Sequence, residues 1–229
     1  MFYWLILTIP PLLLGLYAQA KVKSTFAKYS QVRPVRGLNG ADAAAAVLQA
    51  SGLPNLKIEA IDGHLTDHYD PRSKTLRLSA DVGASSSIAA LGVAAHEAGH
   101  AIQDAKGYLP MQIRQSIVPI AQIGSSVGIY AVMGGLILSA QSAFGASLFY
   151  VGIALFSVAV LFQLVTLPVE FDASRRALVV LEQSGLLTSE EMPGARKVLN
   201  AAALTYVAGF LAALGQLLYF VLAFAGNRD

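Results

Sequence analysis

The chain of 229 residues is 55% hydrophobic and 13% charged, and its mean hydropathy is +0.57. Soluble domains carry about 25% charged residues, so this composition excludes an ordinary soluble protein and indicates a membrane protein. The net charge of +2 does not support a nucleic-acid partner, and the absence of cysteine excludes disulfides and thiolate metal sites. Any metal site must therefore use histidine and carboxylate ligands.

Three stretches of the chain lack charged residues over the length that a membrane span requires. They are residues 1–20, 115–169 and 201–226, and a helix needs about 20 apolar residues to cross a bilayer. The middle stretch is long enough for a transmembrane hairpin with a turn near 139–146, so we predict four crossings. Residues 18–20, AQA, resemble a signal-peptidase site, but no basic residue precedes them, so we interpret residues 1–20 as a retained span.

Lysine and arginine are concentrated in the two segments between the predicted spans, residues 21–114 and 170–200, and are absent from the predicted turn. Cytoplasmic loops of membrane proteins carry an excess of these residues, so we expect both segments to face the cytoplasm and both termini to lie outside. Together the segments are large enough for one compact domain, which the hairpin interrupts. The sequence therefore predicts a multi-pass protein of the plasma membrane, with a lipid bilayer around its spans.

Four secondary-structure elements are predicted before the second span. In chain order they are a helix over 39–52, strands over 56–62 and 74–80 with a turn-rich segment 63–73 between them, and a helix over 88–105. Asn39 or Gly40 is expected to cap the first helix, and the serines at 85–87 are expected to cap the second. These elements indicate a small α+β domain.

The second of these helices carries two histidines four residues apart, in the sequence AAHEAGHAIQD of residues 94–104. On a helix this spacing places His96 and His100 on one face, where neutral imidazoles can bind a single Zn²⁺ ion. Glu97 points to the side of this pair and is positioned to act as a general base toward a zinc-activated water. The pattern predicts a catalytic zinc site with one Zn²⁺ per chain.

A zinc site of this kind needs a third protein ligand. The candidates are His64, His68, Glu170 and Asp172. Because the hairpin carries the chain out and back, residues 167–182 return to the side of the HEAGH helix. If this segment is helical, Asp172 aligns with Arg176 at i+4, whereas Glu170 shares a face with small residues. His64 and His68 lie on a turn-like segment, where a spacing of four residues gives no common face.

Three sequence segments carry a family resemblance. They are DHYDPRSKTLRLS at 67–79, SIAALGVAAHEAGHAIQ at 87–103 and LPVEFDASRRAL at 167–178. In this order, and with four hydrophobic segments, they resemble the YugP-like family of membrane zinc metallopeptidases over nearly the whole chain. That family is similar in plan to the HtpX-like and CAAX prenyl membrane proteases, which are gluzincins.

The resemblance implies roles for four residues. His96, His100 and Glu170 would be the zinc ligands, and Glu97 would be the general base. The wider gluzincin pattern often has an aspartate four residues after the ligand glutamate, where this chain has Ser174. The resemblance therefore does not specify which group orients His96, and Asp172 is one candidate for that role.

Substrate-binding residues are expected in and around the predicted strands. The candidates are His68, Lys74, Arg77 and Arg176. A structural or solvent-exposed role is the alternative for His68. Residues 74–79, KTLRLS, would bind an extended peptide if they form an edge strand, and would not if they form an inner strand.

We therefore expect a mainly α polytopic membrane protein with about four transmembrane helices and a small α+β, zincin-like cytoplasmic domain. Its expected activity is zinc-dependent endopeptidase cleavage of membrane or membrane-adjacent proteins, so its partners are protein or peptide substrates. No residue pattern specifies an oligomeric state.

Two alternative functions are weaker. A site-2-type intramembrane protease would need its HExxH helix to span the bilayer, but the apolar run between Asp81 and Asp104 is too short and has polar flanks. A non-catalytic zinc-binding scaffold would not need Glu97, which this chain retains.

Overall fold

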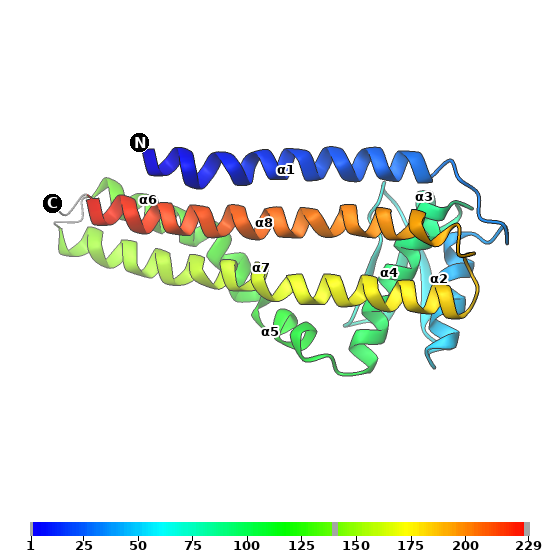
Figure 1. Ribbon diagram of the computed structural model, residues 1–229. Helices are drawn as coiled ribbons and strands as arrows, with labels where there is room; N and C mark the ends of the chain where they lie inside the picture. Colours follow the sequence, from blue (N-terminus) through cyan, green and yellow to red (C-terminus); the bar gives the residue numbers. More distant parts are fainter. Residues whose placement is uncertain (1, 139–141, 227–229) are drawn as a thin grey trace. The chain divides into compact units, whose positions relative to one another are not determined.

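The computed structural model describes residues 2–138 and 142–226, and these are mainly helical (Figure 1). Four helical runs are long and apolar enough to cross a membrane. They are α1 (Phe2–Tyr29), the run formed by α5 (Leu109–Ile123), the π-helix η1 (Gly124–Gly128) and α6 (Ile129–Ile137), α7 (Ala143–Gln183), and α8 (Met192–Gly226). The predicted mainly α, four-span architecture is thereby confirmed. The predicted turn near 139–146 lies partly outside the described residues.

The chain divides into two compact units. The first, which we call the helical unit, comprises Met1–Ala18, Gln112–Leu167 and Thr205–Asp229. The second, which we call the α/β unit, comprises Gln19–Met111 and Pro168–Leu204. Helices α1, α5, α7 and α8 each contribute residues to both units.

The helical unit is held together by aromatic packing and by small residues at close helix contacts. The rings of Phe149 and Phe224 stack with their centroids 3.7 Å apart. A Cβ atom on Gly152 of α7 would lie 2.5 Å from the backbone nitrogen of Val132 on α6. Close backbone approach at glycine is typical of helices that pack in a bilayer.

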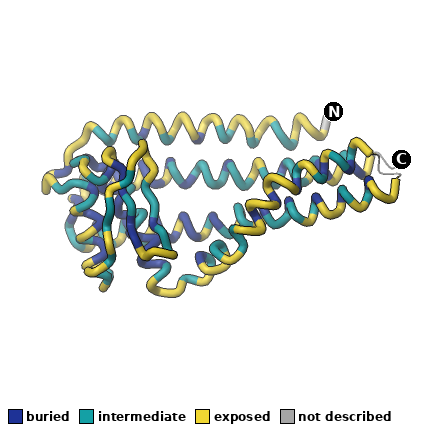
Figure 2. Tube along the Cα trace, turned by 180° about the vertical axis from the view of Figure 1, so that it is seen from behind, coloured by how far each residue is buried: buried dark blue, intermediate teal, exposed yellow. Residues whose placement is uncertain are grey.

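The α/β unit contains a three-stranded sheet and the remaining helices. Its further elements are α2 (Gly40–Ala50), β1 (Lys57–Ile61), β2 (His68–Asp70), β3 (Thr75–Ser79), α3 (Ala80–Gly83) and α4 (Ile88–Ala105). The strand order is β1-β3-β2, with β3 parallel to β1 and antiparallel to β2. Leu76 and Leu78 of β3 are buried in the core with residues of α2 and α4. Figure 2 shows buried positions gathered in this unit, whereas α1 is exposed along most of its length.

The structure adds one strand to the predicted sheet and decides between two alternatives for another. Residues 63–73, which were expected to be rich in turns, contain β2, whose Tyr69 pairs with Leu76. The sequence pattern for a strand is weak at residues 68–70, because β2 has only three residues, two of them polar, and Pro71 follows it. Of the predicted residues 74–79, Thr75–Ser79 form the central strand β3, so the inner-strand interpretation is correct and β2 is an edge strand.

The predicted helix caps are present. Asn39 begins α2 with a capping box, in which its side chain accepts from the backbone of Asp42 and the Asp42 carboxylate accepts in return. Ser87 begins α4 and accepts a hydrogen bond from the backbone nitrogen of Ala90 at 3.2 Å. Local sequence therefore sets where α2 and α4 begin.

Candidate metal centre

Helix α4 crosses α7 at very short range beside the HEAGH sequence. A Cβ atom on Gly99 would lie 2.5 Å from the carbonyl oxygen of Ala173, so only glycine fits here without a shift of the backbone. Ala98 and Ala173 are also fully buried. These small residues therefore allow the histidine-bearing face of α4 to pack against the part of α7 that carries Glu170.

His96, His100 and Glu170 form the group of residues that could hold a metal ion, with ligand atoms within 4.8 Å of one another. The Glu170 Oε2 atom lies 3.2 Å from His96 Nε2 and 3.6 Å from His100 Nε2. A tetrahedral zinc ion about 2.0–2.1 Å from each ligand places the ligand atoms about 3.3 Å apart. The distances from Glu170 to the two histidines therefore fit zinc.

The other ring nitrogen of each histidine has a hydrogen-bond partner. His96 Nδ1 lies 3.0 Å from Ser174 Oγ, and His100 Nδ1 lies 3.0 Å from Gln103 Oε1. An amide oxygen only accepts, so His100 donates from Nδ1 and keeps the lone pair of Nε2 for a metal. Ser174, four residues after Glu170, is therefore the hydrogen-bond partner of His96 Nδ1.

Gln103 is fully buried and connects the two helices of the site. Its Nε2 donates to the carbonyl oxygen of Val169 at 2.8 Å and to Asp172 Oδ2 at 3.0 Å. Because both partners are acceptors, the orientation of the Gln103 amide is determined. Its Oε1 atom must then face His100 Nδ1 as a hydrogen-bond acceptor. Gln103 is not among the site residues predicted from the sequence, although its position three residues after His100 on one helix indicates that the two side chains can meet.

Asp172 lies outside the group of three possible ligands. Its carboxylate accepts from Gln103 and pairs with Arg175 and Arg176, the latter at the expected i+4 spacing. Within the described part of the chain, Asp172 therefore hydrogen-bonds to neither histidine and is linked to His100 through Gln103. The orienting role considered for Asp172 toward His96 is taken by Ser174.

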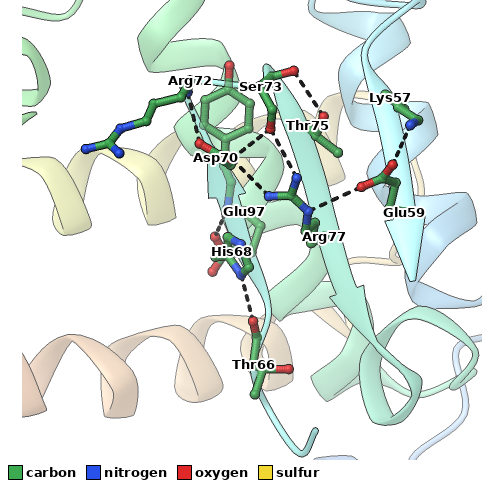
Figure 3. A network of polar contacts seen from close by, with 11 residues as sticks. Lys57, Glu59, Thr66, His68, Asp70, Arg72, Ser73, Thr75, Arg77 and Glu97 are labelled. Carbon is green, nitrogen blue, oxygen red and sulfur yellow. Dashed lines mark hydrogen bonds and ion pairs between the residues drawn. The ribbon is translucent and has the colours of Figure 1, made fainter. Parts of the chain in front are cut away.

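Glu97 lies beside the edge strand β2, outside the group of possible ligands (Figure 3). Its Oε2 accepts a hydrogen bond from the backbone nitrogen of Tyr69 at 3.2 Å. Burial raises the pKa of Glu97 to about 7, with the negative charges of Glu170 and Asp67 adding to the effect and His96 opposing it. A carboxylate with a pKa near neutrality can both accept and return a proton.

The other predicted residues bind partners within the α/β unit. Arg77 Nη1 donates to Asp70 at 3.0 Å and Arg77 Nε to Glu59 at 3.2 Å, on the face of the sheet drawn in Figure 3. Lys74 pairs with Asp104, and Arg176 pairs with Asp172. None of these contacts involves the metal-binding group.

The two histidines considered as alternative third ligands lie elsewhere. His64 pairs with Asp81, and His68 Nδ1 lies 2.9 Å from the carbonyl oxygen of Thr66. Within the described ranges, neither belongs to the group that could hold a metal ion. His64 and His68 are therefore four residues apart in the sequence but do not form a second metal-binding pair like His96 and His100.

Comparison with known proteins agrees with this geometry. Residues 4–225 match the family described as "Putative neutral zinc metallopeptidase". The chain is 44% identical over 226 residues to "Putative membrane protease YugP" of Bacillus subtilis (strain 168), an alignment that covers 99% of this chain and 98% of the relative. No solved structure shows a significant match. Since the family match extends over almost the entire chain, this protein belongs to that family of zinc metallopeptidases.

Proposed function

We propose that the protein is a membrane-bound, zinc-dependent endopeptidase that hydrolyses peptide bonds of membrane or membrane-adjacent proteins. The observation that carries the proposal is the convergence of His96 Nε2, His100 Nε2 and Glu170 Oε2. Glu97 lies close enough to His96 and Glu170 to interact with their charges. Three protein ligands leave one position of a tetrahedral ion open, which is typical of catalytic zinc sites and not of structural ones.

In this proposal Glu97 is the general base, and His96, His100 and Glu170 hold the metal. Zinc bound by these ligands would supply a Lewis acid for the attacking water and the peptide carbonyl. Glu97 takes a proton from that water and later passes it to the leaving amine. Ser174 and Gln103 keep the two imidazoles in the tautomer that offers Nε2.

The position of an edge strand beside Glu97 supports a peptide as the substrate. The backbone nitrogen of Tyr69 on β2 points to Glu97 and not to β3. An extended peptide can add to the exposed edge of a sheet by backbone hydrogen bonds. We therefore transfer the peptide-binding role considered for residues 74–79 to β2, with His68 near its start.

Helix α4 is not among the four candidate membrane spans of the described residues, which argues against a site-2-type intramembrane protease. The concentration of Lys and Arg in residues 21–114 and 170–200 supports a cytoplasmic active site in the plasma membrane. The alternative function, a zinc-binding scaffold without catalytic activity, is disfavoured. Such a scaffold would not need Glu97, which is present here and lies next to the metal-binding group.

Metal analysis combined with proteolysis tests the proposal. The full chain in detergent micelles is expected to contain about one zinc per chain and to cleave some members of a panel of unfolded membrane proteins. Removal of zinc with a chelator should stop cleavage, and added zinc should restore it. A protein that holds zinc but cleaves no member of the panel would favour the scaffold.

A further inference from the structure

A pocket of about 400 Å³ lies next to the candidate active site within the α/β unit. It is bounded by residues 52–56, which join α2 to β1, by Tyr69 of β2, and by the C-terminal half of α4. Most of its walls are apolar, and the side chains that form them include Leu53, Pro54, Leu56, Ala101 and Ala105. A pocket of this size and lining suits one large apolar side chain.

Three of the polar side chains that line the pocket, Tyr69, Lys74 and Asp104, interact with one another. Asp104 accepts a hydrogen bond from the Tyr69 hydroxyl at 2.7 Å and pairs with Lys74. Burial and the neighbouring Asp104 raise the pKa of Tyr69 far above its usual value, so the phenol stays protonated and remains a donor. An ionised ligand side chain would lose hydration here without finding an unengaged counter-charge, which disfavours charged occupants.

Tyr69 lines the pocket and also contacts Glu97, so the pocket lies near the proposed general base. Ala101 follows Glu97 by four residues on α4, so it lies on the same helix face and about 6 Å further along the axis. Tyr69 contacts both Glu97 and the pocket, because its backbone nitrogen donates to Glu97 while its side chain lines the pocket. A ligand at Glu97 and a ligand in the pocket would therefore share one wall.

An extended peptide along β2 would reach the pocket close to its cleaved bond. Side chains on one face of a strand recur about every 6.8 Å, which is similar to the axial distance from Glu97 to Ala101. A peptide residue aligned with Tyr69 would direct its side chain to the same face of the sheet as Tyr69, toward α4. One side chain within two residues of the scissile bond can thus enter the pocket.

We propose that this pocket binds a large apolar side chain of the substrate, within two residues of the scissile bond, and thereby determines cleavage preference. This inference rests on the proposed peptidase function, and it names the substrate class. Leu53 and Ala105 are then residues that determine specificity, although they contact neither the metal-binding group nor Glu97 by any hydrogen bond. Peptides with a leucine or phenylalanine at that position should be preferred over those with alanine, aspartate or lysine.

Two substitutions and one matched control test the pocket. Ala105→Trp adds bulk at an exposed lining position, and Leu53→Asp places a carboxylate in the apolar wall. Ala45→Trp is the matched control for Ala105→Trp. It makes the same alanine-to-tryptophan change at an exposed position of α2 that does not line the pocket. The full chain in detergent is assayed with a set of quenched fluorescent peptides. Each peptide differs from a common parent at one position, which is one of the two residues before or the two residues after the scissile bond.

The expected result is a change in the ratio of kcat/KM for leucine peptides to that for alanine peptides. The ratio should be about tenfold or more for the wild type and Ala45→Trp, and should approach one for both pocket variants. Zinc content equal to wild type shows that each variant retains the folded site. An unchanged ratio in both pocket variants with normal zinc would overturn the pocket proposal alone, whereas absence of peptide cleavage by the wild type would overturn the peptidase function on which it rests.

Discussion

His100 Nδ1 and Gln103 Oε1 lie 3.0 Å apart on one face of α4. The same Gln103 amide donates to Val169 and Asp172 of α7. One buried side chain therefore sets the tautomer of His100 and connects the two helices that contribute the possible zinc ligands. Partners of ligand histidines typically change metal affinity by about 10- to 100-fold when they are removed.

Replacing Gln103 with leucine should weaken zinc binding by about 10- to 100-fold, because it leaves His100 Nδ1 and the Val169 carbonyl without their partner. Competition with a chromophoric chelator measures the affinity. Gln49→Leu, at an exposed position of α2, is the matched control and should bind zinc as the wild type does. Wild-type affinity in Gln103→Leu would show that His100 does not depend on this hydrogen bond.

Replacing Glu97 with glutamine should abolish hydrolysis while zinc remains bound. The neutral amide cannot take a proton from water, but the three ligand atoms are unchanged. Zinc content by elemental analysis and peptide cleavage are measured on the same sample, with Glu182→Gln at an exposed position of α7 as the control. Loss of zinc from the Glu97 variant would mean that the base and a ligand have been misassigned.

Replacing Glu170 with alanine should remove both zinc and activity, whereas Asp172→Ala should keep most of its zinc and lose about 10- to 100-fold of its activity. Glu170 Oε2 faces both histidines, but Asp172 acts through Gln103 and its arginine pairs. Elemental analysis and cleavage rates of the two purified variants distinguish these roles. A Glu170→Ala protein with wild-type zinc content would contradict the assignment.

Replacing Gly99 with alanine should destabilise the protein by about 1–3 kcal/mol and weaken zinc binding, because the new methyl group would meet the backbone of Ala173. Gly92→Ala on the same helix is the matched control, since its Cβ would lie 3.7 Å from Ala195, an ordinary contact. Thermal unfolding in detergent compares the two variants. Equal melting temperatures would show that α4 and α7 can separate without cost.

Single cysteines test on which side of the membrane the charged segments lie. The natural chain has no cysteine, so each introduced thiol is the only one. Cysteines at Lys57 and Arg196 should be shielded from an impermeant thiol reagent in intact cells, and one at Ser142 should be labelled. The reverse pattern would place the candidate active site outside the cell.

The local sequence was sufficient for the features that depend on near neighbours. Hydrophobic length predicted four spans, the caps at Asn39 and Ser87 predicted two helix starts, and the i+4 spacing of His96 and His100 predicted a shared helix face. Each of these properties arises within a few residues or from composition over one helix. The pairing of Asp172 with Arg176 was predictable for the same reason.

Tertiary structure decided what depends on segments far apart in the chain. Which carboxylate lies beside His96 and His100 follows from the close crossing of α4 and α7 at Gly99. The strand β2 exists because β3 supplies its partner, and three residues with two polar side chains have too little intrinsic strand preference to be recognised alone. Backbone pairing and helix crossing are long-range contacts, so the amino-acid pattern of each segment, taken by itself, leaves them open.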